Sequence, residues 1–222
     1  PNLIGVHMTH LEADEIRLFA EQGGQVVHCP QSNLKLASGH CPVAALTNAG
    51  VNVALGTDGA ASNNDLDMFA EMQTAALLAK GLNNDACALP AEQALAMATL
   101  NGARALGIDA VTGSLAVGKS ADIVAVDLSQ PETQPVYHPA SQLVYAAGRE
   151  QVNNVWIRGR QVLRQRALPT IALEGTLQPI AILEVPIRCV DGHQAACFGC
   201  HNHSAHGKIP AMTRIKLFFL YT

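Results

Sequence analysis

Short apolar runs alternate with amphipathic segments along the first half of the chain. The runs are rich in valine, isoleucine and leucine and end at glycine or polar residues, which is typical of buried strands. The amphipathic segments repeat their apolar positions with helical spacing and carry capping or glycine signals at their ends. We therefore predict strands at 2–7, 24–28 and 51–55, a loop at 29–36, and helices at 9–23, 42–50, 65–80 and 90–106.

The order of these elements predicts the type of sheet. A helix between each pair of successive strands requires a parallel sheet, so the first part of the chain is an α/β fold. After Gly113 the pattern changes to short strands and turns, with a strand at 123–126 and a hairpin at 152–163. We interpret this second part as a small β appendage on the α/β body.

The last part of the chain, from about residue 171, fits neither pattern. It contains three of the six cysteines and four of the nine histidines, and it has no sustained periodicity. We interpret it as an unassigned tail, for which a shifted reading frame is the leading explanation. The predicted domains are therefore 1–112, 113–170 and 171–222.

Composition narrows the class of protein. Charged residues make up 14% of the chain and the formal net charge is −4, so the basic excess of a nucleic-acid binder is absent. No run approaches the roughly 20 apolar residues that cross a membrane. Cys29, Cys41 and Cys87 stand apart in apolar contexts, which predicts reduced, buried thiols and a cytoplasmic location. The chain starts at Pro1 on an apolar strand, without an initiator methionine, so we interpret it as a fragment of a longer protein.

Ionisable side chains stand at the C-terminal end of each predicted strand: His7, His28 and Asp58. Each has an ordinary interpretation by itself, as an Asx-type turn for Asp58 or as a satisfied strand-end histidine. Their shared position favours a site, because the carboxyl ends of parallel strands meet at one edge of a sheet or barrel. Gly56 and Gly59 flank Asp58 and allow a sharp turn and a close ligand. We therefore expect all three side chains to face one crevice.

Four spaced motifs give the chain a family resemblance. Over about residues 1–170 the chain resembles the metal-dependent amidohydrolase superfamily, and within it the 5-methylthioadenosine/S-adenosylhomocysteine deaminases. The motifs are VHMTHL at 6–11, HCPQSNLKLASG at 28–39, LGTDGAASNN at 55–64 and GSLAVGKSAD at 113–122.

The resemblance implies both a fold and a metal. The fold is the C-terminal portion of a (β/α)8 TIM-type barrel, strands six to eight, with strands of a small β-sandwich appendage. The metal is one zinc ion per complete site. Asp58 matches the metal ligand on strand eight, where it also moves a proton. His7 matches the histidine on strand six, beside the attacking water and the leaving group.

Residues of the second motif are candidates for supporting roles. Ser32, Asn33 and Lys35 are predicted to contact substrate, as is Asp58. In the alternative, Ser32 and Asn33 satisfy the backbone of their own loop. His28 is interpreted as a structural residue that holds the loop at 30–39.

The predicted function is zinc-dependent hydrolytic deamination of an adenosine-type thioether to an inosyl product and ammonia. The remaining ligands of the family's metal, a His-x-His pair and a further histidine, have no counterpart before the tail, so we expect the chain alone to be inactive. The alternatives are a chlorohydrolase- or guanine-deaminase-like enzyme and a catalytically silent chain whose strands cannot close a barrel. The expected partner is a purine nucleoside, with no nucleic acid and no membrane; a homo-oligomeric full-length form stays open.

Overall fold

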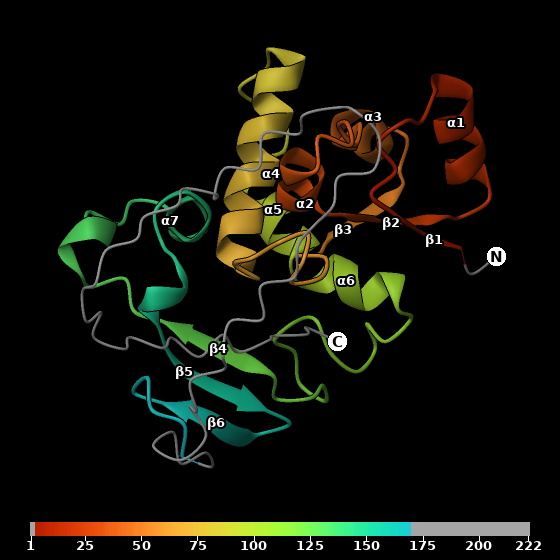
Figure 1. The fold of residues 1–222 in the computed structure, drawn as a ribbon. Coiled ribbons are helices and arrows are strands. Elements are labelled where there is room, and N and C mark those ends of the chain that lie inside the picture. Colours follow the sequence, from red (N-terminus) through yellow and green to blue (C-terminus); the bar gives the residue numbers. More distant parts are fainter. Residues whose placement is uncertain (1–2, 170–222) are drawn as a thin grey trace, which may run out of the picture. The chain divides into compact units, whose positions relative to one another are not determined.

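The structure is a computed structural model that describes residues 3–169 (Figure 1). The predicted tail at 171–222 lies outside the described residues. Three strands form the first sheet: β1 (Ile4–Val6), β2 (Gln25–His28) and β3 (Asn52–Leu55). Their order is β1-β2-β3 and both pairings are parallel, which confirms the predicted sheet type.

Helices follow each of the three strands, as the alternating pattern predicts. They are α1 (Ala13–Glu21), α2 (Pro30–Lys35), α3 (Val43–Asn48), α4 (Met68–Asn83), α5 (Ala91–Met97) and α6 (Leu100–Ala105). Four of them, α3 to α6, contact β3. Val26, Val53 and Leu55 of the sheet pack into one buried apolar cluster with residues of α3, α4 and α5.

Two helix starts differ from the prediction. Helix α1 begins at Ala13 instead of near Thr9, because the Glu15 carboxylate accepts the Glu12 N–H at 2.8 Å and makes Glu12 the cap. Helix α4 begins at Met68 instead of Asp65, because the Asp67 side chain caps it.

The predicted loop at 29–36 is wrong, because residues Pro30–Lys35 form helix α2. Proline is favourable in the first turn of a helix, where its missing N–H has no partner to lose. The six residues of α2 are too few to show the helical repeat of apolar positions in the sequence. The site described below depends on this helix.

The single helix predicted at 90–106 is also wrong, because the chain breaks at Thr99 between α5 and α6. Thr99 has the non-helical angles φ −135° and ψ −94°. Beyond the break, Asn52 donates to the Asn101 carbonyl at 2.9 Å and the Asn101 side chain donates to the Val53 carbonyl at 2.9 Å. The break therefore lets α6 dock on β3.

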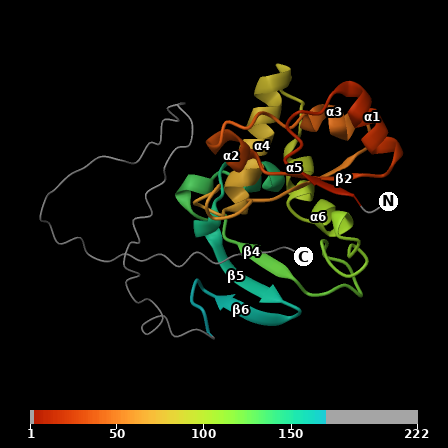
Figure 2. The same cartoon turned by 45° about the vertical axis from the view of Figure 1, so that its right-hand side comes forward.

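The second sheet is antiparallel and has the order β4-β5-β6, with its strands side by side in Figure 2. Its strands are β4 (Ile123–Val126), β5 (Val152–Ile157) and β6 (Arg160–Arg164), which confirms the predicted strand and hairpin. Between β4 and β5 lie η1 (Pro131–Thr133), α7 (Pro139–Tyr145) and η2 (Arg149–Gln151), none of which the pattern predicted. Helix α7 packs against α4 and α5.

The described residues, 3–169, also bear on the predictions about membrane-spanning helices and buried cysteines. Within that range no helix combines the length and apolar character needed to cross a membrane. Cys29 and Cys41 are buried free thiols as predicted, whereas Cys87 is exposed, so the prediction was wrong for Cys87. Cys87 lies in the turn that follows α4, where its N–H is bound by the Asp85 carboxylate.

Candidate active site at the strand ends

The structure brings His7 and Asp58 together at the carboxyl edge of the parallel sheet. The His7 Nε2 atom lies 3.7 Å from Asp58 Oδ2, although the residues follow β1 and β3, which are separated by β2. The two side chains are 38% and 31% exposed, so a small molecule can reach both of them. The backbone N–H of His7 donates to the Val27 carbonyl and extends the β1–β2 pairing to the site.

Both residues have a left-handed backbone conformation. His7 has φ +69° and Asp58 has φ +59°. Residues other than glycine rarely adopt these angles, at a cost of roughly 1–3 kcal/mol, and such strain is concentrated at functional sites. Asp58 itself therefore makes the turn that we assigned to the flanking glycines. Gly56 instead allows its backbone to pack closely against the Val27 side chain, because a Cβ atom there would lie 3.0 Å from Val27 Cγ1.

Three donors surround the Asp58 carboxylate. Its Oδ2 atom accepts the hydroxyls of Ser62 at 2.6 Å and Ser32 at 2.7 Å, and its Oδ1 atom accepts the Gly59 N–H at 2.7 Å. These hydrogen bonds, that of Ser62 foremost, lower the pKa of the Asp58 carboxyl to about 2. Asp58 is therefore ionised and oriented at neutral pH.

Asn33 fixes the orientation of the His7 ring. The His7 Nδ1 atom lies 2.8 Å from Asn33 Oδ1, which can only accept, so Nδ1 carries the proton. In the neutral ring with this tautomer, the other nitrogen, Nε2, carries the lone pair and lies on the side of Asp58. A histidine held in this way can accept a hydrogen bond from a ligand or a proton from a reacting water.

Helix α2 supplies the residues that hold the pair. Ser32 and Asn33 are buried on this helix, and their side chains bind Asp58 and His7 instead of the backbone of their own segment. Lys35 donates to the Ala61 carbonyl at 2.7 Å and to Asn64 Oδ1 at 2.6 Å, so it ties α2 to the loop after β3. Substrate contact by Ser32 and Asn33 stays a prediction.

The third predicted residue, His28, does not join this pair. Its side chain is 1% exposed and lines a separate hollow of about 230 Å³ together with residues of α3 and α4. Burial lowers the pKa of His28 to about 4, so the ring is neutral at physiological pH. The expectation that all three strand-end groups face one crevice is therefore wrong, since only His7 and Asp58 lie together.

Sequence reasoning missed Ser62, Asn63 and Glu71. Glu71 is 0% exposed on α4, where its Oε1 atom accepts from Asn63 Nδ2 at 2.5 Å and its Oε2 atom accepts from the Gln31 N–H at 3.3 Å. Burial raises the pKa of the Glu71 carboxyl to about 7, against the two hydrogen bonds. The sequence holds one trace of Glu71, since this residue lies in the same helical stripe as the buried Met72 and Ala75, but the sequence alone does not name its partners.

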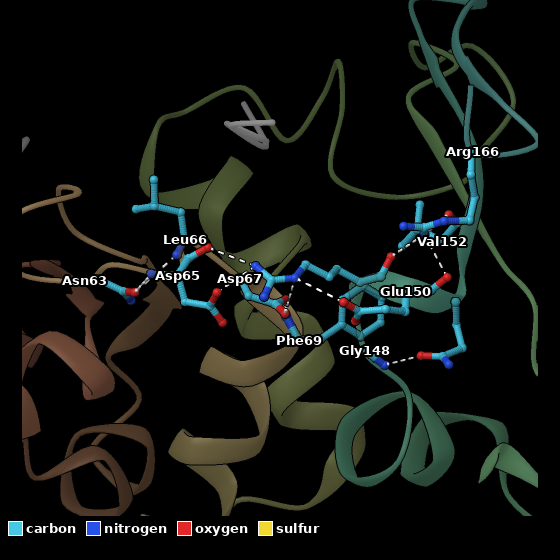
Figure 3. A network of polar contacts seen from close by, with 11 residues as sticks. Asn63, Asp65, Leu66, Asp67, Phe69, Gly148, Glu150, Val152 and Arg166 are labelled. Carbon is cyan, nitrogen blue, oxygen red and sulfur yellow. Dashed lines mark hydrogen bonds and ion pairs between the residues drawn. The ribbon is translucent and has the colours of Figure 1, made fainter. Parts of the chain in front are cut away.

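The loop from Gly59 to Asp67 is also held at its far end (Figure 3). Arg149 Nη1 lies 2.7 Å from Asp65 Oδ1, and Arg149 Nε lies 3.8 Å from Asp67 Oδ2. Arg166 in turn donates to the Arg149 carbonyl at 3.0 Å. This end is open to solvent, with Arg149 41% and Asp65 42% exposed.

The donor set fits one ligand of a metal rather than a whole metal site. An ionised, oriented carboxylate such as Asp58 is a suitable oxygen ligand for zinc, which takes four ligands in structural sites and keeps three protein ligands in catalytic ones. Residues 3–169 contain no group of three or more histidine, cysteine, aspartate or glutamate side chains that could hold a metal ion. The described part of the chain therefore supplies at most part of a metal site, and Asp58 is its candidate ligand.

A comparison with protein families decides the relationship. The model of the amidohydrolase family matches residues 1–162. The chain belongs to the amidohydrolase family. Two curated relatives are named 5-methylthioadenosine/S-adenosylhomocysteine deaminase: that of Teredinibacter turnerae is 56% identical over 167 residues and that of Moorella thermoacetica 50% over 172 residues. These matches cover 75% and 78% of this chain but 38% and 40% of the relatives' length.

Solved structures give the same family. An adenosine deaminase from Xanthomonas campestris with bound zinc is 61% identical, with a TM-score of 0.76 over 78% of this chain and 39% of that one. An atrazine chlorohydrolase from Arthrobacter aurescens complexed with zinc is 27% identical, with a TM-score of 0.71 over 77% of this chain and 38% of that one. Together with the family match, these likenesses indicate a TIM-barrel family.

Proposed function

We propose that this amidohydrolase chain carries one side of the active site of a hydrolytic deaminase. The proposed substrates are adenosine-type thioethers, 5-methylthioadenosine and S-adenosylhomocysteine, which are converted to inosyl products and ammonia. The observation that carries the proposal is the contact between His7 Nε2 and Asp58 Oδ2 at 3.7 Å, at the edge of the sheet where such folds bind ligands. The names of the two curated relatives support the substrate class.

The two residues suit the proton transfers of deamination. The reaction adds water at C6 of the purine ring, places a proton on a ring nitrogen and releases ammonia. Asp58 is ionised, so its carboxylate can take the proton of the attacking water and pass it to the departing amine. His7 presents the lone pair of Nε2 and can hold the attacking oxygen against C6 through a hydrogen bond.

Zinc is the proposed metal, and Asp58 is the ligand that the described residues would contribute. When bound, zinc supplies a Lewis acid that makes hydroxide available at neutral pH. We further propose that β1, β2 and β3 correspond to barrel strands six, seven and eight, and that residues 113–170 form the appendage. A cytoplasmic location remains a prediction that rests on the free thiols of Cys29, Cys41 and Cys87.

We expect the chain alone to be inactive. Three parallel strands cannot close a barrel, and both β1 and β3 have only one neighbour in the described sheet. Ile4 and Val6 of β1 leave apolar side chains exposed, which suits a strand that needs further cover. Turnover of methylthioadenosine by this chain with added zinc would contradict this expectation.

A chlorohydrolase-like activity is the second candidate, supported by the 27% identical atrazine chlorohydrolase. A guanine-deaminase-like enzyme would use the same Asp58 and His7. Four compounds should therefore be compared as substrates of the chimera described below: methylthioadenosine, S-adenosylhomocysteine, guanine and a chlorotriazine. Preference for guanine or the chlorotriazine would replace the proposed substrate class and leave the two residues in their roles.

A chimera tests the site directly. In the Teredinibacter turnerae relative, the aligned segment is replaced by the 167 aligned residues of this chain. We expect the chimera to deaminate methylthioadenosine, measured by the loss of adenine absorbance. We expect Asp58→Asn to lower kcat by about 10²–10⁴-fold. Asp14→Asn, at an exposed carboxylate of α1, is the matched control and should keep full activity. A folded chimera without activity, or an active Asp58→Asn variant, would overturn the proposal.

A further inference from the structure

The Glu71 carboxylate lies between the two segments that hold Asp58. One segment is α2, which supplies Ser32, and the other is the loop after β3, which supplies Ser62. Glu71 binds the residue next to each of these serines, namely Gln31 through its N–H and Asn63 through its side-chain amide. The buried Glu71 carboxylate therefore connects the two segments whose serine hydroxyls bind Asp58.

The direction of the Asn63 amide is fixed from the other side. Its Oδ1 atom accepts the backbone N–H groups of Asp65 at 3.0 Å and Leu66 at 3.1 Å. The NH₂ group must then point at Glu71, because turning the amide over would face a donor to these two N–H groups. Asn63 is 3% exposed, so water cannot replace a lost partner.

We propose that Glu71 is a positioning residue for Asp58, acting through Asn63 and Gln31 to keep the Ser62 and Ser32 hydroxyls on the carboxylate. The inference deepens the proposed function, since it takes from it the role of Asp58. Glu71 does not touch Asp58, so it sets the geometry of the site without joining the reaction. Its two oxygen atoms both accept, and this double acceptance is the property that the role requires.

Exchanging the amide and the carboxylate provides a sharp test of that property. In Glu71→Gln, the new amide can accept from only one of its two partners and turns its NH₂ group toward the other donor. Adding Asn63→Asp supplies a carboxylate at position 63 that accepts from this NH₂ group and from the N–H groups of Asp65 and Leu66. The double variant has the charge and hydrogen-bond pattern of the original with the partners reversed.

The experiment measures native-state amide hydrogen exchange in this chain at pH 8, without metal or substrate. The Gly59 amide reports on the Asp58 carboxylate, because it donates to Oδ1. The Asp65 and Leu66 amides report on Asn63, and the Ala76 amide in the middle of α4 reports on general opening. Met72→Ala, a buried neighbour of Glu71 on α4, is the control for lost core packing.

We expect Glu71→Gln to accelerate exchange at Gly59, Asp65 and Leu66 by about tenfold or more, and exchange at Ala76 by less than about threefold. Addition of Asn63→Asp should return the three loop amides to within about threefold of their original rates. Met72→Ala should accelerate all four amides together. This pattern of local loss and rescue would not arise from a merely structural role in the core.

Three results would overturn the proposal. The first is equal acceleration of all four amides by Glu71→Gln, as in Met72→Ala. The second is a double variant in which the Ala76 amide exchanges slowly, as in the original chain, but the Gly59 amide still exchanges fast. If Glu71→Gln does not fold, the double variant decides: native protection of Gly59 supports the proposal, and an unfolded chain overturns it. Because no metal or substrate is involved, an inactive chimera would refute the proposed function without changing this result.

Discussion

The loop from Gly59 to Asp67 is held at one end by a buried anchor and at the other by a surface anchor. The buried anchor is the Glu71 carboxylate with Asn63 and Gln31. Glu71 and Asn63 are buried, and Gln31 is half-buried. The surface anchor is the Arg149 guanidinium with the exposed Asp65 and the less exposed Asp67. Figure 3 labels the two aspartates. Both use charge, but Asn63 and Glu71 are 3% and 0% exposed, whereas Arg149 and Asp65 are 41% and 42% exposed.

The difference shows how burial changes what a charged group contributes. In the exposed Arg149–Asp65 pair of the surface anchor, water competes for both side chains and salt screens them, so this ion pair adds little to stability. At the buried anchor, ionisation itself is costly, which is why the pKa of Glu71 is raised to about 7. What the buried carboxylate gains is orientation, because each of its oxygens has one defined donor.

The largest expected effect concerns the pH dependence of the buried anchor. Because the pKa of Glu71 is raised from 4.5 to about 7, the folded state binds its proton more tightly than the unfolded state. This contribution to the free energy of unfolding is complete below pH 4.5 and is lost as the pH rises through 7, with a slope of at most about 1.4 kcal/mol per pH unit. Glu71→Gln should remove that slope, measured by urea unfolding between pH 4.5 and 8.

The control for this prediction is Arg149→Gln, which should keep the slope of the original chain. Equal slopes in Glu71→Gln and the original chain would mean that the buried carboxylate titrates normally. The contrast between the two anchors would then disappear.

The smallest expected effect concerns the surface anchor. Arg149→Gln should lower the free energy of unfolding by less than about 1 kcal/mol, because the pair is exposed. The difference should shrink further in 1 M salt, where the screening length is about 3 Å. A loss of several kcal/mol that persists at high salt would show that the two anchors are energetically alike.

The strands could be predicted because their signal is local. The runs before His7, His28 and Asp58 are apolar and end abruptly, so the sheet type and the strand ends followed from the sequence. Helix α2 and the break at Thr99 could not be predicted in this way. Helix α2 is too short for a periodicity, and the break exists because Asn101 docks on β3.

The site could be predicted only in its exposed half. His7 and Asp58 were found because they stand at strand ends and match motifs, and the structure brings them together. Their supports depend on contacts between segments distant in sequence, such as Glu71 with Gln31. Glu71 left one trace, a carboxylate in an apolar helical stripe, and that trace had no meaning until its partners were known.

The proposed site depends on Asp58, which hydroxyl and backbone donors hold as an ionised carboxylate at the strand end. The most direct test is a ¹³C NMR titration of the Asp58 carboxyl in this chain without metal, with Ser62→Ala as the comparison. We expect a midpoint at about 2 in the original chain and a higher one in Ser62→Ala, which lacks the strongest of the donors. A midpoint at the ordinary value of 3.8 in the original chain would show that these donors do not hold the ionised carboxylate.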